Sequence, residues 1–336
     1  MPPGFKSRLL RQCKYQLLIQ RLVLFFYPMV VQKPLLQGLF RTFSRKGILN
    51  QLHFSLRKQA RKAKLLSVPV FFTPPRSKWR IVGKALREVR QNVVIATKLF
   101  LNGTECESDE ATYNASRKHL EASLERLQTD YVDIYYLHRT GSAPLDRIAR
   151  AMGKLIEDGL IRGWGLSQVD VPIIDKAHRI TPLTAVQNIY SVVERDAEQR
   201  VIPYCLENGI GFVPFSPIAS GLLSGKITAE TKFEKNDDVR NWVPQLSKQN
   251  IVGNQPIVDI LKEYAEKKNA TPAQISLAWM LHKYPNVVPI PGSKNKERII
   301  ENLNASEVEL TESEFVGLED ALGKCRIYGH RGLSGY

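Results

Sequence analysis

Two ionisable side chains follow neighbouring apolar runs of the sequence, at the point where each run ends. Lys98 closes the run 93–97, and His138 closes the run 132–137. Taken singly, a lysine after a strand is usually a solvated surface group, and a histidine there is about as often structural as catalytic. Adjacent parallel strands lie about 4.8 Å apart, which would bring both side chains into one pocket. We therefore predict that Lys98 and His138 form a catalytic pair.

A second group of residues with a common chemistry lies near the C-terminus, where the apolar run 287–290 leads into Gly292, Ser293 and Lys294. A strand end, a Gly-Ser turn and a following helix present free backbone N–H groups and a helix dipole to an anion. Lys294 and Arg298 add positive charge, and the guanidinium of Arg298 can grip a phosphate. The pattern indicates a phosphate site, with an ordinary capped surface helix as the alternative.

The elements that must position these residues alternate regularly beyond about residue 80. Apolar runs fall at 93–97, 132–137, 161–166, 184–189, 210–214 and 287–290, and helical patterns at 113–127, 144–158, 171–180, 198–208, 256–268 and 272–282. Repeats of strand and helix imply right-handed crossovers and a parallel sheet covered by helices. The phosphate-binding signatures of open sheets are absent, because no G-x-G-x-x-G follows the first run and no G-x-x-x-x-G-K-[ST] occurs anywhere. This favours an α/β fold of the (β/α)8 TIM barrel class, with its chemistry where strands end.

Six runs do not close an eight-stranded barrel, so two more strand-helix units would have to precede residue 93. The N-terminal part shows no convincing ones. Its strong apolar run, 22–31, contains Pro28 and is too short to span a bilayer. No small-x-small cleavage site of a signal peptide follows it, and 87 residues is long for a mitochondrial presequence. We expect a barrel that is incomplete at its beginning and no membrane span.

The net charge of +15 is concentrated in this N-terminal part. Nineteen of the 48 Lys and Arg residues precede Glu88, the first acidic residue, so from Glu88 onward 29 basic residues face all 33 acidic ones. The two parts differ sharply in their content of acidic residues, which predicts a basic segment of uncertain fold at 1–80 and a barrel body at 81–336. The basic segment suits salt-sensitive binding to nucleic acid or an anionic membrane. Because it carries no recognition module, we expect no specific nucleic-acid partner.

The cysteines show no pattern of a metal site or a disulfide scaffold. Cys13, Cys106, Cys205 and Cys325 lie far apart and form no C-x-x-C spacing. This favours a reduced, cytoplasmic setting and packing roles for the thiols, without a metal.

Several motifs, all in one order, resemble the aldo-keto reductase family. Residues 122–138 (ASLERLQTDYVDIYYLH) look like the family's signature, and residues 289–302 look like its cofactor segment. The stretches GWGLS at 163–167, QNIY at 187–190 and FSPIASGLLSGK at 215–226 also match. The resemblance covers about 81–335 and leaves out the N-terminal quarter. It implies a (β/α)8 barrel that reduces aldehydes and ketones, with NADPH as cofactor and a small carbonyl compound as substrate.

The resemblance also implies roles for single residues around the nicotinamide. Lys98 and His138 match two of the family's four catalytic residues, the Lys that lowers the pKa of a tyrosine acid and the His that orients the carbonyl. Tyr190 would stack on the nicotinamide. Ser167 and Gln187 would hold the carboxamide, although Gln168 stands where the family usually has Asn.

The resemblance also implies which residues would contact the phosphates and the adenine of the cofactor. The pyrophosphate would be lined by Ser216, Pro217, Ile218, Ser220, Gly221 and Lys226. In the segment that begins with Gly292 and Ser293, Lys294 and Arg298 would take the 2′-phosphate. Glu301 and Asn302 would face the adenine.

The other two catalytic residues of the family, an Asp and a Tyr, are missing from the sequence. In the family they come from Asp-Thr-Ala and Tyr-Gly segments before the helix that matches residues 83–86. This chain has no Asp before Glu88, and Tyr15 and Tyr27 stand in no such context. We hypothesise that residues 1–80 do not descend from the family's first two strand-helix units, through a shifted reading frame or replacement by unrelated sequence. The alternative function is a non-catalytic NADP(H)-binding or regulatory barrel, similar to the potassium channel β subunits.

Overall fold

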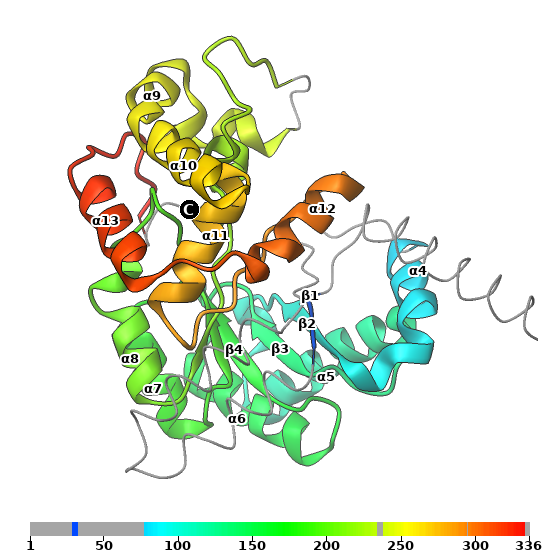
Figure 1. Cartoon of the computed structure of the whole chain (residues 1–336). Helices are drawn as coiled ribbons and strands as arrows, with labels where there is room; N and C mark the ends of the chain where they lie inside the picture. Colours follow the sequence, from blue (N-terminus) through cyan, green and yellow to red (C-terminus); the bar gives the residue numbers. More distant parts are fainter. Residues whose placement is uncertain (1–28, 33–76, 234–237, 294, 333–336) are drawn as a thin grey trace, which may run out of the picture.

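The computed structural model describes residues 29–32, 77–233, 238–293 and 295–332. In this part of the chain one sheet of six strands runs in chain order, and Figure 1 labels the first four of them. The strands are β1 (Met29–Gln32), β2 (Val93–Leu99), β3 (Ile134–Leu137), β4 (Trp164–Ser167), β5 (Ala185–Gln187) and β6 (Gly211–Phe212). The strands from β2 to β6 are parallel, as the sequence predicts, whereas β1 pairs antiparallel with β2.

The predicted strand at 287–290 extends the sheet beyond β6. Val287 forms a parallel bridge with Phe212. The backbone N–H groups of Val288 and Ile290 donate to the carbonyl oxygens of Phe212 and Pro214, over 2.9 and 3.0 Å. This run therefore ends at the same edge of the sheet as the parallel strands before it.

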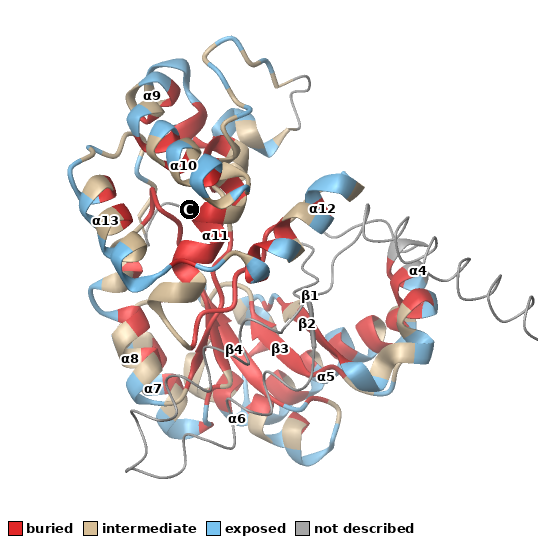
Figure 2. Ribbon diagram, in the orientation of Figure 1, coloured by how far each residue is buried: buried red, intermediate tan, exposed pale blue. Residues whose placement is uncertain are grey.

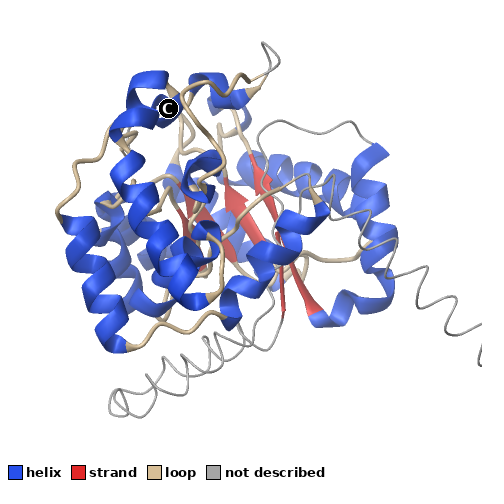
Figure 3. Cartoon of the chain, turned by 45° about the horizontal axis from the view of Figure 1, so that its top comes forward, coloured by secondary structure: helices blue, strands red, loops and turns tan. Residues whose placement is uncertain are grey.

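The predicted helices are confirmed, with bounds that differ by no more than about one turn, and they lie around the strands (Figure 3). The α-helices are α4 (Ser77–Leu86), α5 (Asp109–Leu127), α6 (Leu145–Glu157), α7 (Val171–Ile180), α8 (Val201–Glu207), α9 (Lys248–Gly253), α10 (Gln255–Lys268), α11 (Pro272–Lys283), α12 (Lys296–Leu303) and α13 (Glu312–Gly323). Short 3-10 helices are η1 (Arg87–Asn92), η2 (Gly103–Glu105), η3 (Asp196–Glu198), η4 (Ala219–Ser224), η5 (Val239–Trp242), η6 (Pro244–Leu246) and η7 (Asn304–Glu307).

Local sequence signals set the ends of these helices. Ser108 caps α5, because its hydroxyl accepts the N–H of Ala111 over 3.0 Å. Thr271 begins α11 with a capping box that includes Gln274, and Pro272 occupies the first turn, where it costs no hydrogen bond.

The strands are coloured almost entirely as buried in Figure 2. Their alternate residues belong to two separate hydrophobic clusters. The outer cluster lies between strands and helices, and its strand residues include Ile95, Tyr135, Leu166, Val186 and Phe212. The inner cluster is formed by Val94, Ala96, Ile134, Tyr136, Ala185, Ile189, Val213, Phe215, Val288 and Ile290. Side chains on a strand alternate between its faces, so the inner cluster fills the interior of the barrel. Gly165 provides room there, since a β-carbon at this position would lie 2.5 Å from the ring of Tyr136.

The described part of the N-terminal quarter differs from a family barrel. The neighbour of β2 is β1, with Met29 opposite Ala96 in an antiparallel ladder. A strand-helix unit returns its next strand parallel to the first, so β1 is not such a unit. The segment 1–80 thus contributes a strand to the sheet, and most of it lies outside the described residues.

Three further sequence expectations concern membranes, metals and thiols. Within the described ranges, no helix combines the length and apolarity that crossing a bilayer requires. The same residues contain no group of three or more His, Cys, Asp or Glu side chains arranged to hold a metal ion. Cys106 and Cys205 are buried free thiols, Cys325 is a half-buried one, and Cys13 is outside the described residues.

Candidate active site

Polar side chains stand at the carboxyl ends of four neighbouring strands, on the interior side of the barrel. Each of them comes two residues after a position that faces the interior. The pairs are Ala96 and Lys98, Tyr136 and His138, Gly165 and Ser167, and Ala185 and Gln187. The ladders place Ser167 directly beside Gln187. Because side chains alternate with a period of two, the four predicted residues share one mouth of the barrel.

Positive charges dominate the half of this mouth formed by β2 and β3. Burial lowers the pKa of Lys98 to about 7, with a smaller contribution from the charge of Arg139. Burial also lowers the pKa of His138 to about 4, and the charges of Lys98 and Arg139 add to the effect. Arg139 donates a guanidinium N–H to the carbonyl oxygen of His138 over 2.8 Å. At neutral pH the imidazole is therefore neutral, and the Lys98 ammonium gives up its proton more readily than that of an exposed lysine.

The buried carboxylate of this region, Asp133, lies at the opposite end of the strands. Asp133 accepts the N–H of Ile95 over 2.9 Å and pairs with Arg90 at 2.8 Å. The guanidinium carbons of Arg90 and Arg162 lie over the ring of Tyr131, at 3.9 and 4.2 Å from its centroid. Asp133 thus fixes the starts of β2 and β3 and does not serve the mouth.

The ends of β4 and β5 are tied together by their own side chains. Gln168 has a left-handed backbone (φ 57°), and its Oε1 accepts the N–H of Ile189 over 3.1 Å. Asn188 pairs with the backbone of Val169 in both directions, over 3.1 and 2.7 Å. These hydrogen bonds fix the positions of Ser167 and Gln187, the two residues predicted to hold the carboxamide of the nicotinamide. The hydroxyl of Ser167 is buried without a hydrogen-bond partner among the described residues.

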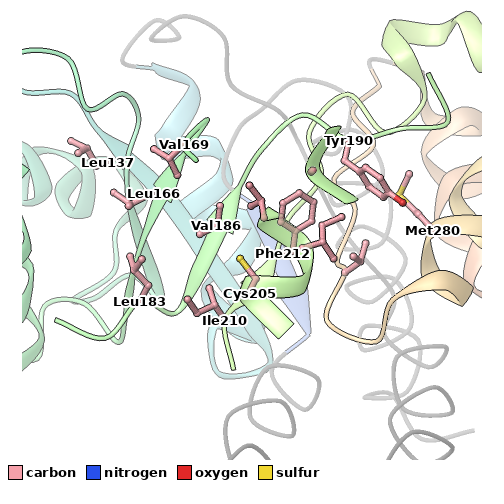
Figure 4. Close-up of a cluster of buried hydrophobic side chains, with 14 of the residues drawn as sticks. Leu137, Leu166, Val169, Leu183, Val186, Tyr190, Cys205, Ile210, Phe212 and Met280 are labelled. Carbon is pink, nitrogen blue, oxygen red and sulfur yellow. The ribbon is translucent and has the colours of Figure 1, made fainter. Parts of the chain in front are cut away.

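The position of Tyr190 does not fit its predicted role of stacking on a nicotinamide. Its ring is 0% exposed and belongs to the outer cluster, where Figure 4 shows it beside Met280. It stacks on Trp279 with 5.6 Å between ring centroids, and its hydroxyl donates to Glu198 over 2.8 Å. Tyr190 faces the helices because it is an odd number of residues from Gln187, which faces the interior.

Two aromatic residues at the mouth, Phe215 and Phe100, are not among the site residues predicted from the sequence. Phe215 lies in the inner cluster and directly precedes Ser216. In this region it is therefore an aromatic residue whose side chain faces the interior of the barrel. Phe100 comes two residues after Lys98 and is 56% exposed, which is unusual for a large apolar side chain. Counting in steps of two along the strands could have identified both.

The loop after β6 has a strained backbone. Ser216, Ala219 and Ser220 have left-handed φ angles of 53°, 46° and 55°, and Gly221 follows with 103°. Non-glycine residues adopt this conformation at a cost, and such residues cluster at ligand sites, where successive N–H groups can form a concave anion site. Ser276 of α11 fastens the loop by donating to the carbonyl oxygen of Pro217 over 3.3 Å. Ile218 accepts the N–H of Gly221 over 2.9 Å.

Residues of α12 lie near this loop. Lys226, which ends the predicted pyrophosphate segment, is 3.8 Å from Glu301, measured from Nζ to Oε2. Glu301 also accepts the hydroxyl of Thr271 over 2.7 Å. The structure thus brings together two residues that the sequence assigns to different parts of the cofactor. Asn302 is buried, and its Nδ2 has no hydrogen-bond partner in the described parts of the chain.

The start of α12 is a capped turn. Asn295 accepts the N–H of Arg298 over 2.8 Å, and the hydroxyl of Ser293 accepts the N–H of Asn295 over 3.1 Å. Arg298 is exposed and Gly292 is half-buried, so the turn is open to a ligand. Lys294 lies outside the described residues.

Comparisons with known proteins cover the same part of the chain. The sequence model of the Aldo/keto reductase family matches residues 77–322. A curated relative, "Probable aldo-keto reductase 1" from Glycine max, is 35% identical over 259 residues, which are 76% of this chain and 74% of the relative.

Solved structures give the same result. An aldo/keto reductase from Klebsiella pneumoniae, in complex with NADP and acetate, is similar with a TM-score of 0.57 and 27% identity, over 76% of this chain and 79% of that chain. The glycerol dehydrogenase AKR11B4 from Gluconobacter oxydans has a TM-score of 0.65 and 26% identity, over 74% of this chain and 78% of that one.

Proposed function

The chain belongs to the aldo/keto reductase family, and from this premise we propose that it is an NADPH-dependent oxidoreductase that reduces small aldehydes or ketones to alcohols. The observation that carries the proposal is the convergence of Lys98, His138, Ser167 and Gln187 at one mouth of the barrel. The relative from Klebsiella pneumoniae was solved with NADP, which supports the same cofactor for this chain.

The residues present fit this cofactor. A buried polar group without a partner costs about 1–3 kcal/mol, and two such atoms, Ser167 Oγ and Asn302 Nδ2, occur where the carboxamide and the adenine are predicted. The left-handed loop offers backbone N–H groups to the pyrophosphate, and the exposed guanidinium of Arg298 suits a 2′-phosphate. When bound, NADPH supplies the hydride for the carbonyl carbon.

The described residues at the mouth act on the carbonyl oxygen. His138 is neutral at physiological pH, so its imidazole N–H can orient the carbonyl by a hydrogen bond. The alkoxide that forms needs a proton, and an acid works best when its pKa is near the working pH. The pKa of Lys98, about 7, meets that condition, so its ammonium can stabilise the oxyanion and donate the proton. Phe100 offers an apolar wall to the substrate.

A second function, NADP(H) binding without catalysis, is favoured by one observation: the sequence holds no Asp before Glu88 and no Tyr in the family's context there. The experiment that separates the two functions titrates the full-length protein with NADPH by fluorescence and then adds benzaldehyde while following NADPH absorbance. Binding with turnover supports the reductase. Binding without turnover supports the binding protein, and the absence of both contradicts both functions.

We also propose a cytoplasmic setting and a body at 81–336 that carries the site. The free thiols Cys106, Cys205 and Cys325 support a reducing compartment. All the residues assigned to the cofactor and the carbonyl lie between Lys98 and Asn302, which supports a site carried by this body, while β1 of the segment 1–80 adds a strand to its sheet.

A further inference from the structure

The residues that follow α13, 326–332, form a strap that is fixed at its start by Asn254. The amide Nδ2 of Asn254 donates to the carbonyl oxygen of Tyr328 over 2.9 Å, and its Oδ1 accepts the N–H of Tyr328 over 3.0 Å. Gly253 leaves room for the tyrosine ring, since a β-carbon there would lie 2.6 Å from it. Two hydrogen bonds and a close contact therefore tie the strap to Asn254, the residue between α9 and α10.

Glu194 anchors the far end of the strap. Its carboxylate is 2% exposed and accepts the backbone N–H groups of Arg331 and Gly332, over 2.6 and 3.3 Å. Gln245 donates its amide to the same carboxylate, and His330 Nε2 lies 3.4 Å from it. Burial raises the pKa of Glu194, while the backbone donors and the charges of His330 and Arg331 oppose this. A buried carboxylate needs such donors, so the anchor and the strap stabilise each other.

The end of the strap reaches the residues predicted to hold the carboxamide. Gln168 donates its Nε2 to the carbonyl oxygen of Gly332 over 3.3 Å, while its Oε1 accepts the N–H of Ile189. Gln168 follows Ser167 directly, at the end of β4, and Ile189 lies two residues beyond Gln187 in β5. A single amide side chain thus joins the strap to the ends of two strands that carry the site.

We propose that Glu194 is a positioning residue, which acts through the strap and Gln168 to hold the β4–β5 edge in the arrangement that binds the cofactor. Glu194 itself does not touch the cofactor in this proposal. The identity of the ligand rests on the proposed function, whereas the mechanical link between Glu194 and the β4–β5 edge is a property of the protein alone. The two are therefore tested by separate measurements.

The first measurement is hydrogen–deuterium exchange of the full-length, cofactor-free protein. Glu194→Gln removes one acceptor oxygen from the strap, and we expect exchange at the amides of 167–169 and 189 to rise by about tenfold. Glu314→Gln is the control. Its carboxylate also accepts a backbone N–H, that of Thr311 over 2.7 Å, and pairs with Lys268 rather than with the strap, so its loss leaves the β4–β5 amides unchanged. Wild-type exchange at 167–169 and 189 in Glu194→Gln would overturn the proposal.

The reverse substitution tests the link from its other end. Gln168→Ala removes the contact with Gly332, and we expect faster exchange at the amides of 331 and 332. This variant also decides the question if Glu194→Gln does not fold. Unchanged exchange at 331 and 332 would show that no link exists.

The second measurement is the dissociation constant for NADPH, obtained from fluorescence. We expect Glu194→Gln and Gln168→Ala each to weaken binding by about tenfold and the double variant to be no weaker, because both act through one link. Additive losses of about a hundredfold would mean independent effects and would overturn the proposal. If the wild-type protein does not bind NADPH, the proposed function fails, and the exchange experiment still decides the role of Glu194.

Discussion

Lys98 of β2 lies in register beside Tyr136 of β3, and the pKa values of the two side chains are nevertheless shifted independently of each other. Burial and the charge of Arg139 lower the pKa of Lys98, whereas burial alone raises the pKa of Tyr136. The ring of Tyr136 packs over Gly165, and its hydroxyl has no hydrogen-bond partner in the described ranges. The described tyrosine nearest in register to Lys98 therefore fills the barrel and is not its acid partner.

Tyr136→Phe tests this role. Removing a buried hydroxyl without a partner relieves a desolvation cost, so we expect the free energy of unfolding to rise by about 1 kcal/mol. Turnover of benzaldehyde should stay within about twofold of wild type, since general-acid loss costs about 10²–10⁴. Chemical denaturation and steady-state rates provide the measurements, and a hundredfold loss of turnover without unfolding would identify Tyr136 as the acid.

Turnover should depend on the protonation of Lys98. With a pKa of about 7, the ammonium that donates the proton is lost as the pH rises through neutrality, so kcat should fall about tenfold per pH unit above that point. Lys98→Met should remove this dependence and lower kcat by about 10²-fold. Lys118→Met, on the exposed face of α5, is the control that leaves the profile unchanged. A wild-type rate that is flat between about pH 6 and pH 9 would contradict the assignment.

The same lysine should make stability depend on pH. Below about pH 7 the folded and unfolded chains both carry the Lys98 proton, so the penalty for its buried charge is fully present. Between about 7 and 10.5 the folded protein releases a proton that the unfolded chain keeps, and stability rises with pH. Lys98→Met should therefore stabilise the protein most near pH 6 and progressively less toward pH 10.

Denaturant titrations of Lys98→Met and wild type at several pH values give this difference directly. A stabilisation that grows with pH would show that the lysine is not buried as described. Lys118→Met again serves as the control, because an exposed lysine contributes no such penalty.

The alternation of strand residues places four of the predicted site residues at one mouth of the barrel, and the same alternation does not fit the role predicted for Tyr190. Lys98 and His138 follow from the ends of apolar runs, and a period of two from Gln187 places Ile189, not Tyr190, on the interior side. The motif QNIY gives the order of residues along the chain but not the face that each occupies. The alternation of side chains along the strand, rather than the similarity to the family motif, predicts Phe215 as the aromatic residue that faces the interior.

The strap could not be predicted from the sequence for a different physical reason. Glu194 and Gly332 are separated by 138 positions, and neither residue stands in a local pattern that signals a contact. The antiparallel pairing of β1 with β2 is also a long-range contact, which the apolar run 22–31 does not specify. Local periodicity determines elements and faces, whereas partners across the fold are set by the packing of the whole chain.

Arg298 should distinguish NADPH from NADH. Its exposed guanidinium lies at the start of α12, where a 2′-phosphate would add a charge-assisted hydrogen bond worth about 1.5–3 kcal/mol. Arg298→Ala should therefore weaken NADPH binding by about 10- to 100-fold and leave NADH binding nearly unchanged. Arg179→Ala, on the exposed end of α7, is the matched loss of a surface arginine and should affect neither cofactor. Equal losses for NADPH and NADH in Arg298→Ala would show that this residue supports the helix rather than the phosphate.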